Sequence, residues 1–290
     1  MRMKILLFQG LVGLSEAMYL WLVAAGLSLI FGVLRVLNFA HGSLYMLGAY
    51  LTFYFFGLLG GNFWLGLVVG PIFVAGIGLL MERFFLRLVY RLEVAYQLLL
   101  TFAFVLIFND LVKLIWGPIY QALPMPSGLN DSIVLLSRAY PAYNLFIIIL
   151  GPLIALGLWL LLEKTRWGRL IVASASDKEM ASALGVNVPR LYTRVFMLGA
   201  WLAALGGALS IPIRPVSPGM GETIIIEAFI VAVIGGLGSL KGAFVGAILI
   251  GLLHAYGVLF LPVFEMALAF MLMAVVLILR PWGLFGTRET

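Results

Sequence analysis

Three polar side chains capable of chemistry lie close together in the segment "RVLNFAHGSLYMLGAY". Asn38, His41 and Ser43 belong to a stretch from Val36 to Met81 that contains no Asp, Glu, Lys or Arg. A histidine and a serine could form a base and a nucleophile, but no carboxylate is adjacent to orient the histidine. Asn and Ser are also preferred helix N-caps, so the segment could instead satisfy backbone groups at a helix end. We predict a helix break that helps to form a solute pathway, rather than a hydrolytic site.

Other polar residues also interrupt apolar runs. They count as functional candidates because a polar side chain within a bilayer is costly, and they are Glu16, Glu222, Glu227, His254 and Glu265. For Glu16, Glu222 and Glu265, a position at the membrane interface is an equally good interpretation. We take Glu16 and Glu227 as candidates for the lining of the pathway.

The sequence lacks the motifs of several enzyme classes. It contains no GxxxxGK[ST], HExxH or GxSxG pattern, so we expect no nucleotide hydrolysis, metalloprotease or serine hydrolase chemistry from this chain. Cysteine is absent, which excludes disulfides, thiolate metal sites and cysteine nucleophiles. We therefore predict neither an enzyme nor a cofactor or metal site.

Composition identifies an integral membrane protein. Of 290 residues, 64% are hydrophobic and 10% are charged, whereas soluble domains have about 45–50% apolar and about 25% charged residues. The net charge of +6 would suggest nucleic acid as the partner of a soluble protein. Here the basic residues cluster in short connections between apolar runs, as the sorting of positive loops to the cytoplasm requires. We expect a lipid bilayer as partner and no nucleic acid.

Nine apolar runs predict an all-α polytopic membrane protein, because a helical span needs ~20 mainly apolar residues. We expect about eight transmembrane helices in a single domain over residues 1–290, with segment 223–239 either crossing fully or re-entrant. The runs cover residues 12–34, 43–60, 63–81, 94–115, 142–162, 195–212, 223–239, 242–261 and 264–279.

The composition of the connections between these runs predicts the side of the membrane on which each connection lies. Segments 82–93 and 163–194 are rich in Arg and Lys, which places both in the cytoplasm. Segment 116–141 is rich in Pro and Gly and belongs outside. If the first three runs all span, Arg2 and Lys4 lie outside, against the usual charge bias. Either two charges are too few to decide, or one Gly-interrupted segment is re-entrant or discontinuous.

A cluster of glycines follows near residue 235. Gly235, Gly236 and Gly238 should interrupt a helix and expose backbone groups, which in a membrane must face protein or a water-filled cavity. That favours a break beside a solute pathway. A plain cytoplasmic turn, with Lys241 at the interface, is the alternative.

The same region has an internal echo. "HGSLYMLGAYL" (41–51) resembles "LGSLKGAFVGAIL" (237–249), and transporters are often built from repeats with sites at discontinuous helices. An internal repeat and a chance similarity between apolar segments are equally good interpretations.

Segment 163–194 contains a short helix between two turns. We predict this helix over 176–184, capped by Ser176. Asp177 and Glu179 lie at its N-terminal end, where the helix dipole favours anions. Such a helix is suited to transmitting a movement of a cytoplasmic partner to the membrane-spanning helices. The alternative is that the segment is a plain linker.

Three long motifs resemble those of a known family, the Liv-type permeases of branched-chain amino acid ABC importers. "GLSLIFGVLRVLNFAHGSLYMLGAYL" is similar to the opening signature of that family, "GGLGSLKGAFVGA" to its glycine-rich motif and "RPWGLFG" to its C-terminal ending. Glu179, Ala181 and Gly185 match an E-x-A-x-x-x-G pattern like the one that ABC permeases present to their ATPases. The likeness runs from about residue 11 to 286, and its opening is more similar to the first of the family's two permease subunits.

The resemblance implies a multi-pass subunit of the bacterial inner membrane, an importer component. It implies pairing with a second, related permease subunit, two cytoplasmic ATPase subunits and a periplasmic substrate-binding protein. Substrates of the family include Leu, Ile and Val, and also urea, amides and other small organic acids. We expect ATPase coupling at Asp177, Glu179, Ala181 and Gly185. We expect the substrate pathway at Asn38, His41, Ser43, Glu16, Glu227, Gly235, Gly236 and Gly238.

Two departures from the family bear on the substrate. Glu16 stands where the family often has a small residue, and Glu227 stands where some relatives carry Lys. The sequence therefore leaves the net charge of the solute pathway, and with it the substrate, undecided. The competing function is a self-sufficient channel or secondary transporter, in which the same two carboxylates could couple transport to protons. Uptake that stops on ATP depletion, with the membrane potential kept, would discriminate between the two classes.

Overall fold

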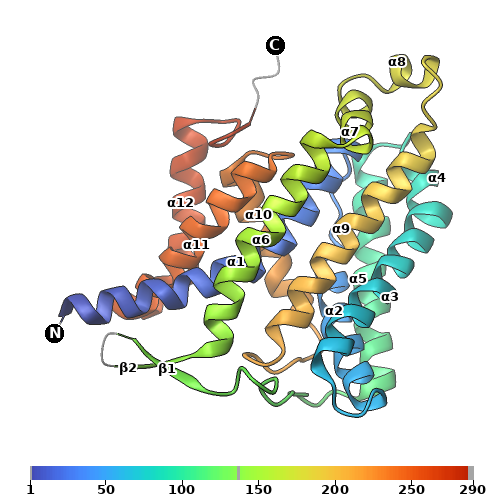
Figure 1. Ribbon diagram of the computed structural model, residues 1–290. Helices are drawn as coiled ribbons and strands as arrows, with labels where there is room; N and C mark the ends of the chain where they lie inside the picture. Colours follow the sequence, from blue (N-terminus) through green and yellow to red (C-terminus); the bar gives the residue numbers. More distant parts are fainter. Residues whose placement is uncertain (1, 136–137, 287–290) are drawn as a thin grey trace.

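The computed structural model describes residues 2–135 and 138–286 and is mostly helical (Figure 1). Within these residues, six helices are long and apolar enough to cross a membrane. They are α1 (Arg2–Leu34), α3 (Phe63–Met81), α5 (Val94–Trp116), α6 (Ala142–Lys164), α9 (Val188–Ser210) and α11 (Leu240–Phe260). Three further apolar helices are α2 (His41–Leu58), α10 (Met220–Gly235) and α12 (Glu265–Leu279).

Each of the nine predicted apolar runs falls on one of these helices, so the all-α polytopic fold is confirmed. The predicted count of about eight spans is not confirmed. α10 and α12 have 16 and 15 residues, which at 1.5 Å per residue is about 24 and 23 Å. Both lengths are below the hydrocarbon thickness of about 30 Å.

Short elements complete the chain. A π-helical segment, η1 (Glu82–Leu86), and α4 (Arg87–Val89) extend α3. The remaining short elements are α7 (Arg166–Ser176), α8 (Lys178–Ala183), the 3-10 turn η2 (Pro262–Phe264) and the strands β1 (Ser132–Leu135) and β2 (Arg138–Pro141).

α1 is the central helix of the bundle. Its 33 residues extend about 50 Å. Within its apolar stretch of 18 residues, 89% of the residues are buried, against 17% in the corresponding stretch of α6. Gly13 of α1 faces Gly251 of α11, and Gly26 faces Gly199 of α9, each without room for a side chain. Because helices in lipid gain little from burying apolar side chains against each other, close backbone approach through small residues stabilises this packing.

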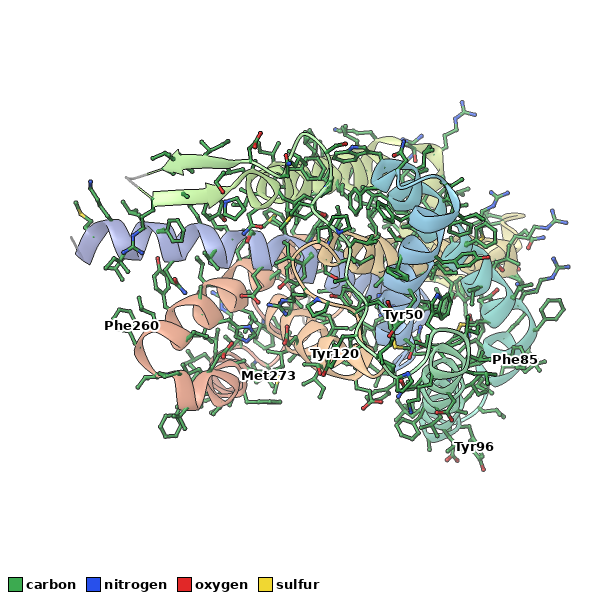
Figure 2. All side chains as sticks on the ribbon, turned by 90° about the horizontal axis from the view of Figure 1, so that it is seen from below. Tyr50, Phe85, Tyr96, Tyr120, Phe260 and Met273 are labelled. Atoms are coloured by element: carbon green, nitrogen blue, oxygen red, sulfur yellow. The ribbon has the colours of Figure 1, made fainter. Side chains whose placement is uncertain are left out.

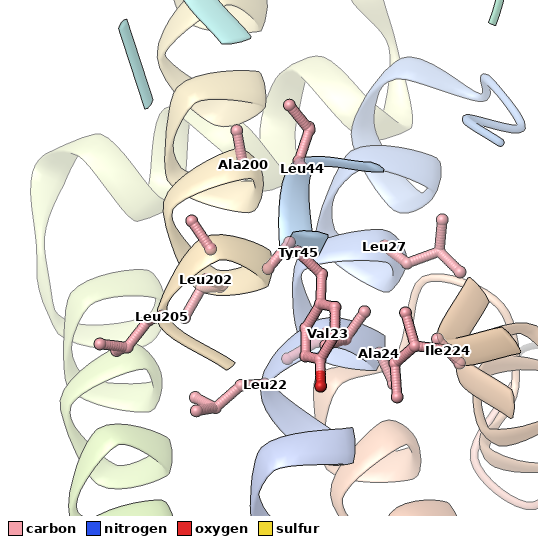
Figure 3. Close-up of a cluster of buried hydrophobic side chains, with 14 of the residues drawn as sticks. Leu22, Val23, Ala24, Leu27, Leu44, Tyr45, Ala200, Leu202, Leu205 and Ile224 are labelled. Atoms are coloured by element: carbon pink, nitrogen blue, oxygen red, sulfur yellow. The ribbon is translucent and has the colours of Figure 1, made fainter. Parts of the chain in front are cut away.

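Four helices converge in the buried cluster that Figure 3 shows. Val23 of α1, Tyr45 of α2, Leu202 of α9 and Ile224 of α10 are all buried there. The perimeter of the bundle is different: Phe85, Tyr96 and Phe260 point away from it (Figure 2) and are about half exposed or more. An apolar perimeter of this kind suits contact with lipid.

The two ends of the bundle differ. α7, α8 and the C-terminal end lie at one end, and the hairpin β1–β2 lies at the other with the N-terminus (Figure 1). Tyr140 of β2 donates its hydroxyl to the Leu11 carbonyl oxygen at 2.8 Å, and its ring centre lies 5.3 Å from that of Phe8. The N-terminal end of α1 therefore shares a side with segment 116–141, despite Lys4. Within that segment β1 and β2 pair as an antiparallel hairpin, which the sequence analysis did not predict.

Candidate functional site

The connection between α1 and α2 runs back into the bundle. α1 ends at Leu34, and α2 begins at His41, whose Nε2 lies 3.0 Å from the carbonyl oxygen of Val23. Val23 lies eleven residues before Leu34, so the start of α2 is about 16 Å inside that end of α1. The predicted helix break is confirmed.

The N-cap of α2 is Ala40, with no side-chain cap bond, which corrects the capping role considered for Asn38 and His41. His41 is fully buried and bonds to α1, where Gly26 leaves room for its ring. Asn38 is also fully buried, and neither atom of its side-chain amide has a hydrogen-bond partner among the described residues.

The N-terminal ends of α2 and α10 meet inside the bundle. A side chain at Gly42 would collide with the Gly221 backbone, and the reverse also holds. The turn before α10 needs a left-handed residue, supplied by Gly219 at φ +87°. Since both helix ends are partly positive, Glu222 in the first turn of α10 is favourable. Its Oε1 accepts a bond from Asn109 of α5 at 3.2 Å.

Charged side chains gather between α1 and the turn after α9. Arg214 forms an ion pair with Glu16, and its guanidinium carbon lies 5.3 Å from the ring centre of Tyr19. The Tyr19 hydroxyl donates to Glu16 Oε1 at 3.1 Å. Glu227 of α10 interacts electrostatically with His254 of α11, Arg214 and Glu16. We call these five residues the Arg214 cluster.

The cluster brings together Glu16 and Glu227, which the sequence proposed separately. Arg214 itself was missed, because it follows the apolar run 195–212 directly and resembles an ordinary interfacial charge. One signal was available: a basic residue is unusual in a short connection that the predicted topology places outside. In the folded chain, the Arg214 side chain is 48% exposed and that of Glu16 is 18% exposed.

The glycine motif lies at the other end of α10. Gly235 is about 12 Å along the helix from Glu227, so the glycines do not share a site with the Arg214 cluster. The predicted interruption is confirmed, since Gly236 and Gly238 have φ values of +101° and +88°. The backbone N–H of Leu284 donates to the Ile234 carbonyl oxygen at 2.8 Å, and that of Phe285 to the Gly235 carbonyl oxygen at 2.9 Å.

The C-terminal motif "RPWGLFG" therefore satisfies carbonyl groups that the end of α10 would leave without partners. A cavity of about 880 Å³ opens beside this break, lined among others by Gly32, Arg35, Gly238 and Trp282. Exposed backbone beside a cavity is the arrangement expected within a membrane protein. Nearby, Lys241 forms an ion pair of 3.2 Å with Glu163 of α6.

The two segments of the proposed repeat start at different levels of α1. Segment 41–51 begins α2 beside Gly26, and segment 237–249 leads into α11 beside Gly32. Six residues of α1 separate these positions, which is about 9 Å. The repeat stays a prediction.

The E-x-A-x-x-x-G residues form a separate short helix, α8. Its N-cap is Asp177, whose Oδ1 accepts bonds from the backbone of Glu179 at 3.0 Å and Met180 at 2.9 Å. This corrects the predicted Ser176 cap, because the Ser176 hydroxyl donates instead to the Val172 carbonyl oxygen in α7. Ala181 is the buried contact of α8.

Gly185 closes α8 in a left-handed conformation, with φ +85°. Its backbone N–H donates to the Ser182 carbonyl oxygen, and that of Val186 to the Ala181 carbonyl oxygen. A Cβ at position 185 would meet no neighbour within 4 Å. Glycine is thus favoured here by backbone conformation and not by lack of space.

Comparisons with known proteins find relatives over nearly the whole length of the chain. A family model described as branched-chain amino acid transport system / permease component matches residues 11–279. The high-affinity branched-chain amino acid transport system permease protein BraD of Pseudomonas aeruginosa is 30% identical over 290 residues, covering 96% of this chain and 94% of BraD. The corresponding permease protein LivH of Escherichia coli is 29% identical over 283 residues, covering 92% of this chain and 91% of LivH.

These matches confirm the resemblance drawn from the three sequence motifs. The family is a transport component and not a catalytic subunit. With six apolar helices, the similarity identifies a multi-pass protein of the bacterial inner membrane. The chain belongs to the family of permease components of branched-chain amino acid transport systems.

Proposed function

We propose that this chain is the transmembrane permease subunit of an ATP-driven ABC importer, which moves branched-chain amino acids or related small polar organic solutes into the cytoplasm. The observation that carries the proposal is α8, which lies beyond the ends of the long helices (Figure 1). Met180 and Leu184 on this segment are 58% and 78% exposed. Large apolar side chains exposed away from lipid mark a contact with another protein.

In this proposal, segment 163–194 is the cytoplasmic coupling loop. Asp177 and Gly185 define the two ends of α8, Ala181 holds it to the bundle, and Glu179 and Met180 face the partner. That partner is a cytoplasmic ATPase subunit, because this chain has no phosphate-binding motif of its own. Two such subunits, a second related permease subunit and a periplasmic substrate-binding protein complete the transporter.

The Arg214 cluster supports an amino acid as the transported solute. A guanidinium pairs well with a carboxylate, and the Glu227 carboxylate suits an ammonium group. A free amino acid carries both charges at neighbouring atoms. Arg214 is half exposed in the single chain, so the second permease subunit would cover the cluster and complete the wall of the pathway. Asn38, His41 and Ser43 lie at the start of α2 and would border the same pathway when it opens.

Transport energetics test the function. We expect the purified chain to retain an ATPase subunit, and uptake in cells to stop when ATP is depleted while the membrane potential is maintained. Uptake that instead follows the membrane potential or the proton gradient, with ATP absent, would establish a channel or secondary transporter. Binding of leucine, valine, urea and amides to the cognate periplasmic protein would then identify the solute class.

A further inference from the structure

A buried carboxylate outside the Arg214 cluster joins two helices at the end of the bundle that carries α8. The Glu82 side chain is fully buried. It accepts hydrogen bonds from Thr193 Oγ1 at 2.6 Å, Tyr90 Oη at 3.1 Å and Arg87 Nη2 at 3.2 Å. An uncompensated buried charge is strongly destabilising. Glu82 can therefore be buried only where these three partners reach its carboxylate.

The π-helical segment η1 makes this arrangement possible. In an α-helix, side chains five residues apart point about 140° apart. In η1 the Arg87 backbone N–H donates to the Glu82 carbonyl oxygen, which closes a wider turn around five residues. Glu82 and Arg87 consequently lie on one side of the helix and form an ion pair. π turns are rare and frequently occur at functional sites.

The partners of Glu82 connect α3 to the first turns of α9. Arg87 Nη2 also donates to Thr193 Oγ1 at 2.7 Å and to the Pro189 carbonyl oxygen at 3.1 Å. Burial, and then the Glu82 carboxylate, raise the pKa of Tyr90 well above its usual value. The Tyr90 phenol therefore stays protonated and remains a donor. The bonds of Glu82 and Arg87 to Thr193 and Pro189 hold the extension of α3 against the start of α9, whereas the Tyr90 bond supports Glu82 from within that extension.

The start of α9 follows α8 almost directly. Residues 184–187 join the two helices, and Asn187 Oδ1 caps α9 by accepting a bond from the Arg190 backbone at 3.1 Å. Pro189 at the second helical position further stiffens this junction. A displacement of α8 must therefore move the first turn of α9, because the link between them is short and bonded.

We propose that Glu82, Arg87 and Thr193 form a tie that passes the movement of α8 from α9 to α3. The proposal rests on the function proposed above, in which an ATPase pushes on α8. α3 in turn packs on α2 through the close contact of Gly70 with Thr52, so the tie reaches the helix that begins at the break. These three residues are positioning residues, since none of them lies in the Arg214 cluster.

The test uses the complete transporter in proteoliposomes, with the binding protein and radiolabelled leucine, and measures solute imported per ATP hydrolysed. Thr193→Val keeps the shape of the side chain and removes its hydroxyl. We expect ATP hydrolysis to persist and the transport ratio to fall at least about fivefold, the lower end of typical coupling between sites. Thr193→Ser should restore the ratio. Tyr90→Phe is the matched control, because it removes a bond to Glu82 without cutting the tie to α9.

A second variant covers the case in which Thr193→Val does not assemble. Glu82→Gln keeps the size of the side chain and removes its charge, and it should lower the ratio in the same way. The double variant, with Thr193→Val and Glu82→Gln together, should lower the ratio no further than the more severe single variant. The reason is that the two substitutions interrupt the same connection between α3 and α9. Unchanged ratios in Thr193→Val and Glu82→Gln would overturn the tie, as would losses that add. A wild-type chain that binds no ATPase would instead overturn the proposed function.

Discussion

Arg214 and Glu16 form an ion pair across 198 residues of sequence. The pair joins the turn between α9 and α10 to the first half of α1, whose most apolar stretch is the most buried among the six long apolar helices of the described residues. It places a cation and an anion within a bilayer-spanning protein, next to the half-buried carboxylate of Glu227. Since polar groups at such positions are costly, their presence here is best explained by a role in transport.

Neutralising Arg214 should separate function from stability. Arg214→Gln should strongly reduce leucine uptake, because the solute carboxylate would lose its cation. Because the Glu16 side chain is only 18% exposed, the loss of its cation should lower the free energy of unfolding by about 1–3 kcal/mol, with the chain still folded and inserted. Lys113→Gln is the control: Lys113 is equally exposed and pairs with Asp110 on α5, and its loss should leave uptake unchanged. Loss of uptake that only follows loss of folded protein would contradict a role in the pathway.

The cap of α8 should control ATP coupling. Asp177→Ala removes the cap and should cost about 0.5–2 kcal/mol of local helix stability, so ATP-driven uptake should fall while membrane insertion and pairing with the second permease persist. Asp177→Asn keeps an oxygen acceptor and should retain uptake. Gly185→Trp should abolish uptake by blocking the ATPase contact and straining the left-handed turn. Normal uptake by Gly185→Trp would show that α8 does not touch the ATPase.

Thiol labelling should establish the sides of the membrane in this cysteine-free chain. Ser127→Cys and Lys4→Cys should both react with an impermeant reagent from outside, because both positions are exposed, Lys4 in the part of α1 that meets β2 and Ser127 in the segment that leads to β1. Lys178→Cys should react only after the membrane is opened. Position 127 is preferred to Gly128, whose φ of +87° would strain a cysteine. Labelling of position 178 in intact cells would invert the topology.

Replacing Asn38 by Leu should change uptake and stability in opposite directions. Its buried amide has no partner in the described residues, and an unmet polar group of this kind costs about 1–3 kcal/mol. Asn38→Leu should therefore keep or raise the melting temperature. Uptake should fall if the amide contacts solute once the pathway opens. His41→Leu removes a bond to α1 and should lower stability by about 0.5–1.5 kcal/mol. Wild-type uptake by Asn38→Leu would remove residue 38 from the pathway.

The junction of α10 with the C-terminal motif should be structural. Gly236→Ala would place a methyl group against the Gly286 backbone, in a left-handed conformation. We expect a loss of about 1–3 kcal/mol, as for overpacking of a filled interior, with uptake reduced in proportion. Gly57→Ala is the control, because it meets no neighbour within 4 Å. Denaturation in detergent checks both, and an unchanged Gly236→Ala melting curve would contradict the packing.

Local patterns predicted much of this protein. The nine apolar runs coincide with helices because a membrane-spanning helix needs about 20 consecutive mainly apolar residues, a pattern that is visible in the sequence alone. The interruption at Gly236 and Gly238 was predictable for a similar reason, since a left-handed turn after a helix favours glycine whatever surrounds it. The cap of α8 was predicted one residue early, because Ser176 and Asp177 are both good caps. Only their bonds in the folded chain distinguish them.

The sequence by itself determined the class of protein, the helices, the family and the position of the short helix at α8, because each depends on neighbouring residues. Only the tertiary structure decided which polar residues meet. Arg214 joins Glu16, and Thr193 joins Glu82 across 111 residues, because packed helices bring distant positions within bonding distance. The π turn that aligns Glu82 with Arg87 also has no signature in hydropathy. It is stabilised by partners on α9, which local sequence does not contain.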